Sequence, residues 1–152
     1  MTGRDWRQLN IEGEYKKNLP IIDGDGREFW MGCKMHKLLI QRCEDCGTYR
    51  FPPRILCSNC LSMNTKWSEV KGRGKIFSFM VAHSAFDASG PKPAWNADLP
   101  LVTATIDMDE GFRMVGQIVG CKPEEVKIGM EVETFFEDAT EDITLPKLKM
   151  IS

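Results

Sequence analysis

Residues 43–60, with the sequence CEDCGTYRFPPRILCSNC, decide the fold of the first half of this 152-residue chain. They contain two Cys-x2-Cys pairs, Cys43 with Cys46 and Cys57 with Cys60. Four thiolates at this spacing are the ligand set of a tetrahedral structural zinc site. Because only a short segment separates the pairs, we predict a minimal zinc ribbon of two short hairpins in which these four cysteines bind Zn2+. A closed four-thiolate site leaves no coordination position for water or substrate, so the predicted role of the metal is structural.

The alternatives for these cysteines are two disulfides, buried free thiols or a redox iron site of the rubredoxin kind. Residues 1–10 are polar and lack the apolar segment of a secretory signal, which predicts a cytoplasmic protein, and cytosolic proteins rarely keep disulfides. The cysteine pairs of rubredoxin-type iron sites usually stand further apart, so zinc is favoured. Cys33 is isolated from both pairs, and we expect a small buried residue there, not a ligand.

Length and composition limit the function classes. A chain of 152 residues suggests one domain, or one small domain with an appendage, and a ribbon this small cannot bury enough apolar surface to fold without its metal. The formal net charge of −2 argues against a surface whose main role is phosphate binding. No apolar run approaches the length that spans a membrane, so we expect neither a membrane segment nor a membrane partner.

We divide the chain into an N-terminal arm (residues 1–24), a helix with the zinc ribbon (25–70) and a barrel (71–152). The arm is polar and rich in glycine, yet it carries Trp6 and Tyr15. It is therefore either a disordered tail or an arm that packs on a partner.

A short helix is expected over residues 25–35, with Asp25 as its cap, because the apolar residues Phe29, Trp30 and Cys33 recur there at helical spacing. Residues 38–41 should then enter the first cysteine pair as a strand, and residues 67–70 should leave the ribbon.

Beyond residue 71 the pattern changes to the period of two that is typical of strands. Five strands are expected, over residues 74–83, 101–108, 112–119, 131–137 and 143–150. With a short helical turn near Pro123, they favour a five-stranded Greek-key barrel of the OB type, bent at Gly74 and Gly116. Pro146 places the last strand at an edge or a bulge.

Three groups of side chains on these strands carry expectations about the core and the loops. Val102, Ala104, Ile106 and Met108 should share one face of their strand. Three aromatic residues are expected to point inward: Phe77, Phe79 and Phe112. The long connection over residues 84–99 carries Phe86, Trp95 and several prolines, which favours an ordered binding loop over a plain surface insertion.

The chain lacks a recognisable catalytic set, and we expect no catalytic residue in it. His36 and His83 are far apart, and the Ser84 and Asp87 near His83 lack the surroundings of a nucleophile elbow. A modest basic strip contains Lys66, Lys71, Arg73 and Lys75. The strip could touch single-stranded nucleic acid, as OB modules commonly do, or the phosphates of a ligand such as coenzyme A.

Taken together, the motifs resemble the family of bacterial and archaeal OB-fold proteins with a rubredoxin-like zinc ribbon that are associated with acyl-CoA metabolism. The resemblance covers residues 25–150 in order. The matching pieces are EFW at 28–30, KLLIQRC at 37–43, CG at 46–47, FPPR at 51–54, Cys57, Cys60, GRGKIFSF at 72–79, GM at 129–130, FED at 136–138 and TLPK at 144–147.

The resemblance implies a non-catalytic subunit that pairs with a thiolase-like enzyme in a hetero-oligomer. The partner would supply the nucleophilic cysteine, and coenzyme A or an acyl-CoA would be shared with it. A narrower hypothesis is the small subunit of a thiolase that acts on an aromatic acyl-CoA such as benzoylsuccinyl-CoA. The other hypotheses are a single-stranded nucleic-acid-binding OB module, against which the expected inward aromatics argue, and an independent enzyme.

Overall fold

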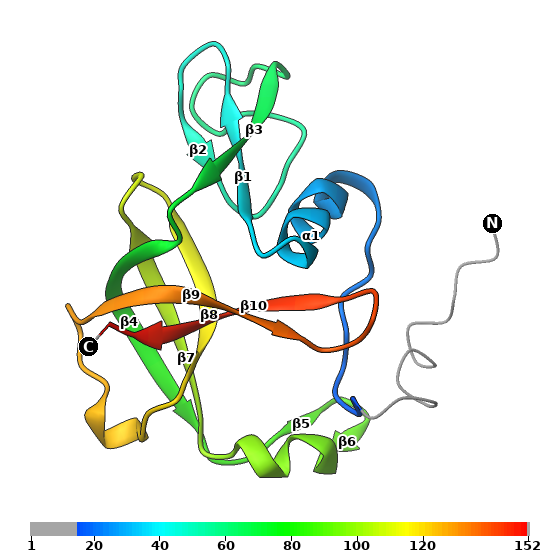
Figure 1. The fold of residues 1–152 in the computed structure, drawn as a ribbon, viewed down its shortest axis with the longest axis vertical. Helices are drawn as coiled ribbons and strands as arrows, with labels where there is room; N and C mark the ends of the chain where they lie inside the picture. The colour runs from blue at the N-terminus through cyan, green and yellow to red at the C-terminus, as the bar shows by residue number, and fades with distance from the viewer. Residues whose placement is uncertain (1–14, 152) are drawn as a thin grey trace, which may run out of the picture.

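The structure is a computed structural model that describes residues 15–151 (Figure 1). A small helical and ribbon part comes first along the chain. It comprises the 3-10 turn η2 (Gly24–Gly26), the helix α1 (Arg27–Lys34) and the strands β1 (Leu38–Cys43), β2 (Tyr49–Arg50) and β3 (Thr65–Val70). The strands form one antiparallel sheet in the order β2-β1-β3. Most of the predicted N-terminal arm, residues 1–14, lies outside the described residues.

The helix α1 buries Phe29, Gly32 and Cys33 against the rest of the molecule. Gly32 is required where the helix meets β1, because a Cβ there would lie 2.7 Å from the Leu39 side chain and 2.9 Å from the Lys37 carbonyl oxygen. The predicted cap is wrong. Asp25 lies inside η2, and the N-cap residue of α1 is Gly26, which has no side chain to cap with.

The second part is a closed five-stranded barrel, as predicted. Its strands are β4 (Arg73–Ala82), β7 (Leu101–Met108), β8 (Arg113–Val119), β9 (Glu131–Asp138) and β10 (Thr144–Met150). They close in the order β10-β8-β7-β4-β9, with β10 parallel to β8 and every other pairing antiparallel. The 3-10 turn η4 (Pro123–Glu125) connects β8 to β9. This order, with its single parallel pair, is that of an OB barrel.

The barrel core follows the predicted alternation on β7. Val102, Ala104, Ile106 and Met108 are all buried there. On β4 the expectation is partly wrong, because Gly74 and Ile76 take the inward positions and a bulge between Ile76 and Ser78 then interrupts the register. Ile76 points into the core, whereas Phe77 is 46% exposed. A bulge adds one residue to a strand and so changes which side chains face inward.

The consequence for the three aromatic residues is a correction. Phe112 is buried as predicted, but Phe77 and Phe79 are exposed. The Arg113 guanidinium lies over the Phe77 ring at 3.7 Å from its centroid, and Asp107 accepts a hydrogen bond from the same guanidinium at 2.6 Å. Two of the three aromatic rings therefore lie at least partly outside the core, and that of Phe77 is covered by Arg113.

The long connection between β4 and β7 is ordered into short elements. It forms a two-stranded hairpin from β5 (Phe86–Asp87) and β6 (Gly90–Pro91), followed by the 3-10 helix η3 (Pro93–Asp98). On the last strand, Pro146 pairs only with β9, because β10 meets β8 further along, at Leu148 and Lys149. The missing amide of Pro146 therefore faces an edge, as expected.

The ribbon part and the barrel share one hydrophobic core. Phe29 and Cys33 of α1 and Leu38 and Ile40 of β1 belong to the same buried cluster as the inward residues of the barrel. Gly72 turns the chain from β3 into β4, and its carbonyl oxygen accepts a hydrogen bond from the Thr134 amide at 2.7 Å. The proposed unit boundaries at residues 24 and 70 stay predictions.

None of the helices within residues 15–151 has the length and apolarity needed to cross a bilayer.

Candidate metal centre and ligand groove

The fold brings the thiols of the two Cys-x2-Cys pairs together. The Sγ atoms of Cys43, Cys46, Cys57 and Cys60 all lie within 4.8 Å of one another. The Sγ atoms of Cys43 and Cys60 are 3.6 Å apart, and those of Cys46 and Cys57 are 3.5 Å apart. Zn–S bonds of about 2.3 Å in a tetrahedron require sulfur atoms about 3.8 Å apart. The separations are far too long for a disulfide bond and fit a tetrahedral metal centre.

Each cysteine pair is built on the same turn, which we call a knuckle. In the first knuckle (43–48) the Gly47 amide donates to the Cys43 carbonyl oxygen at 2.9 Å, and the Cys43 amide donates to the Thr48 carbonyl oxygen at 2.9 Å. In the second knuckle (57–62) the Leu61 amide donates to the Cys57 carbonyl oxygen at 3.0 Å, and the Cys57 amide donates to the Ser62 carbonyl oxygen at 2.9 Å. The two halves of the centre therefore repeat one backbone geometry.

Hydrogen-bond donors around the sulfur atoms favour thiolates. Hydrogen bonds from the Thr48 and Asn59 side chains lower the pKa of the Cys46 thiol to about 5. The backbone amides of Cys60 and Asn59 lower the pKa of Cys57. The pKa of Cys60 rises to about 12 although a backbone hydrogen bond at Ser62 lowers it, because burial and the neighbouring cysteines raise it more. Holding four thiolates this close requires a cation, and the soft sulfur set suits Zn2+.

A second connection between the knuckles has no signature in the sequence. The Asp45 carboxylate accepts hydrogen bonds from the Ser62 hydroxyl and, at 3.1 Å, from the Asn64 side-chain amide. These two bonds lower the pKa of Asp45. They tie the first knuckle to the segment that follows the second, so the two loops are fixed relative to each other.

The remaining cysteines lie elsewhere. Cys33 is fully buried in the core, and burial raises the pKa of its thiol to about 12. Burial also raises the pKa of Cys121, first among its causes. Within residues 15–151, all six cysteines are free thiols, and only the four of the knuckles gather into a potential metal cluster.

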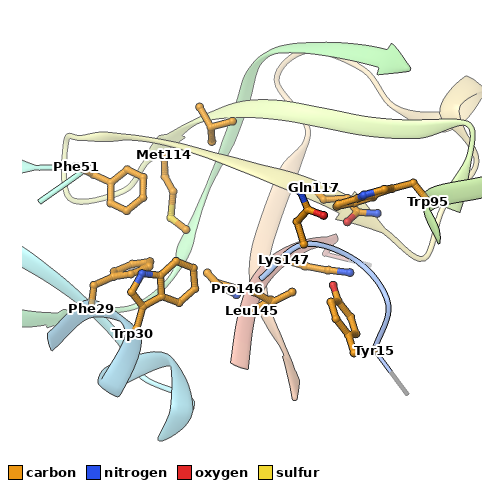
Figure 2. Close-up of a pocket in the computed structure, with 12 residues that line it drawn as sticks. Tyr15, Phe29, Trp30, Phe51, Trp95, Met114, Gln117, Leu145, Pro146 and Lys147 are labelled. Carbon is orange, nitrogen blue, oxygen red and sulfur yellow. The ribbon is translucent and has the colours of Figure 1, made fainter. Parts of the chain in front are cut away.

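A groove of about 280 Å³ lies where α1, the ribbon, the barrel and the N-terminal segment meet (Figure 2). One end is apolar and aromatic, with Phe51, Met114, Phe29 and Trp30 gathered around it. Leu145 and Pro146 form the middle, and Gln117, Lys147, Tyr15 and Trp95 stand at the other end. Asn18 and Val115 complete the lining. An apolar trough with a polar end suits an elongated ligand that has an apolar part and hydrogen-bonding groups.

The polar end of the groove is held together by charged contacts. Lys147, which is buried, forms an ion pair with Glu137. Lys17 forms an ion pair with Asp98 of η3 at 2.6 Å, and its ammonium lies 5.4 Å from the Trp95 ring centroid. Burial raises the pKa of Tyr15, and the nearby Lys17 opposes this shift. These contacts fasten the segment around residue 17 to the connection over residues 84–99, which the sequence predicts to be a binding loop. Of the two aromatic residues in that connection, Trp95 lines the groove and Phe86 does not.

His36 and Asp87 have separate partners. His36 lies 2.9 Å from the Asp138 carboxylate and stacks on Phe136. Asp87 binds Ser89 and Lys92, and no hydrogen bond joins it to His83. In the basic strip, Arg73 lies 3.5 Å from Glu133, which neutralises part of its charge.

Two family models match the chain. Residues 30–64 match "ChsH2, rubredoxin-like zinc ribbon domain", and residues 67–137 match "ChsH2, C-terminal OB-fold domain". Among solved structures, the chain is similar to one described as "Ltp2-ChsH2(DUF35) aldolase", with 32% sequence identity and a TM-score of 0.73, covering 87% of this chain and 98% of that one.

Two curated relatives differ in length. The "DUF35 domain-containing scaffold protein" of Methanocaldococcus jannaschii is 42% identical over 116 residues, which are 74% of this chain and 77% of the relative. The "Probable enoyl-CoA hydratase alpha subunit" of Thermomonospora curvata is 35% identical over 127 residues. That alignment covers 84% of this chain, which spans only 38% of the hydratase subunit's length.

Proposed function

The chain belongs to the ChsH2/DUF35 family of zinc-ribbon and OB-fold proteins, and we therefore propose that it is a non-catalytic scaffold subunit that binds a thiolase-like enzyme and supports its acyl-CoA chemistry. The observation that carries the proposal is the pairing of the zinc-ribbon and OB modules in one core, with the four knuckle thiols gathered into one cluster. The reacting cysteine would belong to the partner.

Zn2+ bound by Cys43, Cys46, Cys57 and Cys60 has a structural role in this proposal. The sulfur separations fit its tetrahedral geometry, and a zinc ion held by four thiolates has no open position for a substrate. The free energy of zinc binding would stabilise a ribbon whose strand β2 has only two residues. These properties support a fixed platform.

Two relatives support a partner enzyme. The solved structure at 32% identity is described as an aldolase of two named components, and the archaeal relative is described as a scaffold protein. The thiolase-like nature of the partner follows from the resemblance of the sequence motifs. The similarity to a hydratase alpha subunit gives a second candidate, in which the chain serves a CoA-ester hydratase.

The groove is the proposed contact with the acyl-CoA. At about 280 Å³ it suits part of such a ligand, the acyl group or the pantetheine arm, and not the whole molecule. The aromatic end suits an aromatic acyl group such as that of benzoylsuccinyl-CoA, and Gln117 and Tyr15 offer hydrogen bonds to an amide or carbonyl. The groove would thus shape one wall of the partner's substrate entrance.

Co-expression tests the proposal. The chain is produced together with a thiolase-like enzyme from the same organism, and the mixture is separated by size exclusion. We expect co-elution, and a loss of thiolase activity when this chain is omitted. Separate elution together with full activity of the enzyme alone would contradict the proposal.

A nucleic-acid-binding module remains the second class of function, and one observation favours it. Phe77 is exposed on the barrel with Arg113 stacked over it, so a base could stack there. Fluorescence anisotropy with a single-stranded oligonucleotide decides the matter. Binding that weakens steeply with salt would support this function, and no binding at low salt would exclude it.

A further inference from the structure

The two knuckles share one backbone geometry but differ at one residue. The first has Gly47 at φ +75°, and the second has Leu61 at φ +62° in the corresponding place. Glycine adopts this left-handed region without strain, whereas a leucine is strained there. The chain therefore uses glycine in one knuckle and keeps a strained leucine in the other.

The strain at Leu61 is not offset by burial of its side chain. Its side chain is 71% exposed in this chain. A strained and exposed apolar residue contributes nothing to the stability of the isolated fold, and strain of this kind concentrates at functional positions. The comparison with Gly47 indicates that the turn itself does not require a side chain.

The surroundings of Leu61 have the composition of the centre of a protein interface. Ile55, Leu56 and Met63 are also exposed and flank the second knuckle; with Leu61 we call them the knuckle surface. Arg54 is the only charged residue between positions 51 and 64, and it forms no ion pair with any described residue. Interface centres are depleted of charge and enriched in methionine and arginine.

The knuckle surface is also held in a fixed conformation. Asp45 binds both Ser62 and Asn64, which lie on either side of Met63. The thiol cluster fixes Cys57 and Cys60 on the other side of Leu61. An apolar side chain that is ordered before association loses less entropy when a partner binds it.

We propose that the knuckle surface is the docking site for the thiolase-like partner, with Leu61 as its anchor. The inference rests on the proposed function and specifies its contact. The partner's face should hold an apolar pocket for Leu61, with a carboxylate at the rim for Arg54. Figure 1 shows the ribbon at one end of the molecule, opposite the β5–β6 hairpin, where it is open to a large partner.

The test uses the full zinc-loaded chain and a thiolase-like enzyme from the same organism that co-elutes with it, with affinity measured by calorimetry. Leu61→Gly restores the residue of the first knuckle, so its unfolding midpoint should equal or exceed that of the unmodified chain. Its affinity should fall at least tenfold. Leu61→Asn, which also tolerates positive φ, should behave alike. Ile128→Ser is the matched control, because Ile128 is 70% exposed on the barrel and should leave the affinity unchanged.

Each outcome is decisive. Affinities of both Leu61 variants within twofold of the unmodified chain would overturn the docking site and leave the proposed function standing. A lower unfolding midpoint or zinc content in both variants would assign Leu61 to the fold and also overturn the site. No association by the unmodified chain would contradict the proposed function itself.

Discussion

Gly74 of β4 packs directly against the backbone of β7, and Gly74→Ala should weaken the barrel. A Cβ at this position would lie 2.4 Å from the Asp107 carbonyl oxygen and 2.7 Å from Ile106 Cγ2. Ordinary contacts begin near 3.4 Å. Because the nearest atom belongs to the backbone, the methyl group can fit only if β4 moves away from β7.

The expected cost follows from three contributions. Inserting a methyl group into this tightly packed contact between β4 and β7 costs about 1–3 kcal/mol. The hydrogen bond from the Asp109 amide to the Arg73 carbonyl oxygen, 3.0 Å long and one residue away, would weaken at a cost of about 1 kcal/mol. Alanine also lowers the conformational entropy of the unfolded chain, which stabilises the folded state by about 0.4–1 kcal/mol. The free energy of unfolding should therefore fall by about 1–3.5 kcal/mol, and the midpoint by about 2–14 °C.

Urea unfolding of the zinc-loaded chain, followed by far-UV circular dichroism, measures this difference. Gly26→Ala is the matched control, because Gly26 has φ −89° and the nearest atoms to an added Cβ lie 3.8 Å away. Its stability should stay within about 0.5 kcal/mol of the unmodified chain. If Gly74→Ala proves as stable as Gly26→Ala, the close approach of the β7 backbone to Gly74 is refuted.

Two further variants test the metal centre and the groove. Cys57→Ser should reduce bound zinc from about one per chain to near zero and unfold the ribbon, since the metal contributes on the order of 10 kcal/mol to folding, whereas Cys121→Ser should keep its zinc. Metal analysis of the purified chains decides this, and iron in place of zinc would contradict the structural assignment. Val115→Arg should place a charged side chain in the groove and weaken acyl-CoA binding by the complex at least tenfold. Ile128→Arg, at an exposed position outside the groove, should leave this binding unchanged. Equal acyl-CoA binding by both variants would exclude the groove as the ligand contact.

Local patterns in the sequence predict most of the fold. The spacing of Cys43, Cys46, Cys57 and Cys60 predicts one cluster because each pair is a single turn. The alternation from Val102 to Met108 predicts the buried face of β7 because a regular strand turns every second side chain inward. The assignment of the four cysteines as zinc ligands remains a proposal, but each of the two Cys-x2-Cys turns that present them is a local structure.

The failures occur where tertiary contacts override a local pattern. On β4 the inward positions belong to Gly74 and Ile76, which leaves Phe77 outside the barrel, and a bulge after Ile76 then breaks the alternation. No residue type in β4 indicates the position of this bulge. The groove joins Tyr15 to Lys147, which only the closed fold brings together. The difference between Gly47 and Leu61 was visible in the sequence, yet it becomes informative only once both residues are known to share a positive φ.

The proposed role of this chain is that of a subunit in a complex with a thiolase-like enzyme. Sedimentation velocity of the purified, zinc-loaded chain mixed with a thiolase-like enzyme from the same organism tests this role most directly. The account predicts that a single faster-sedimenting species, containing both proteins, replaces the two separate boundaries. Two unchanged boundaries at micromolar concentrations of both proteins would contradict it.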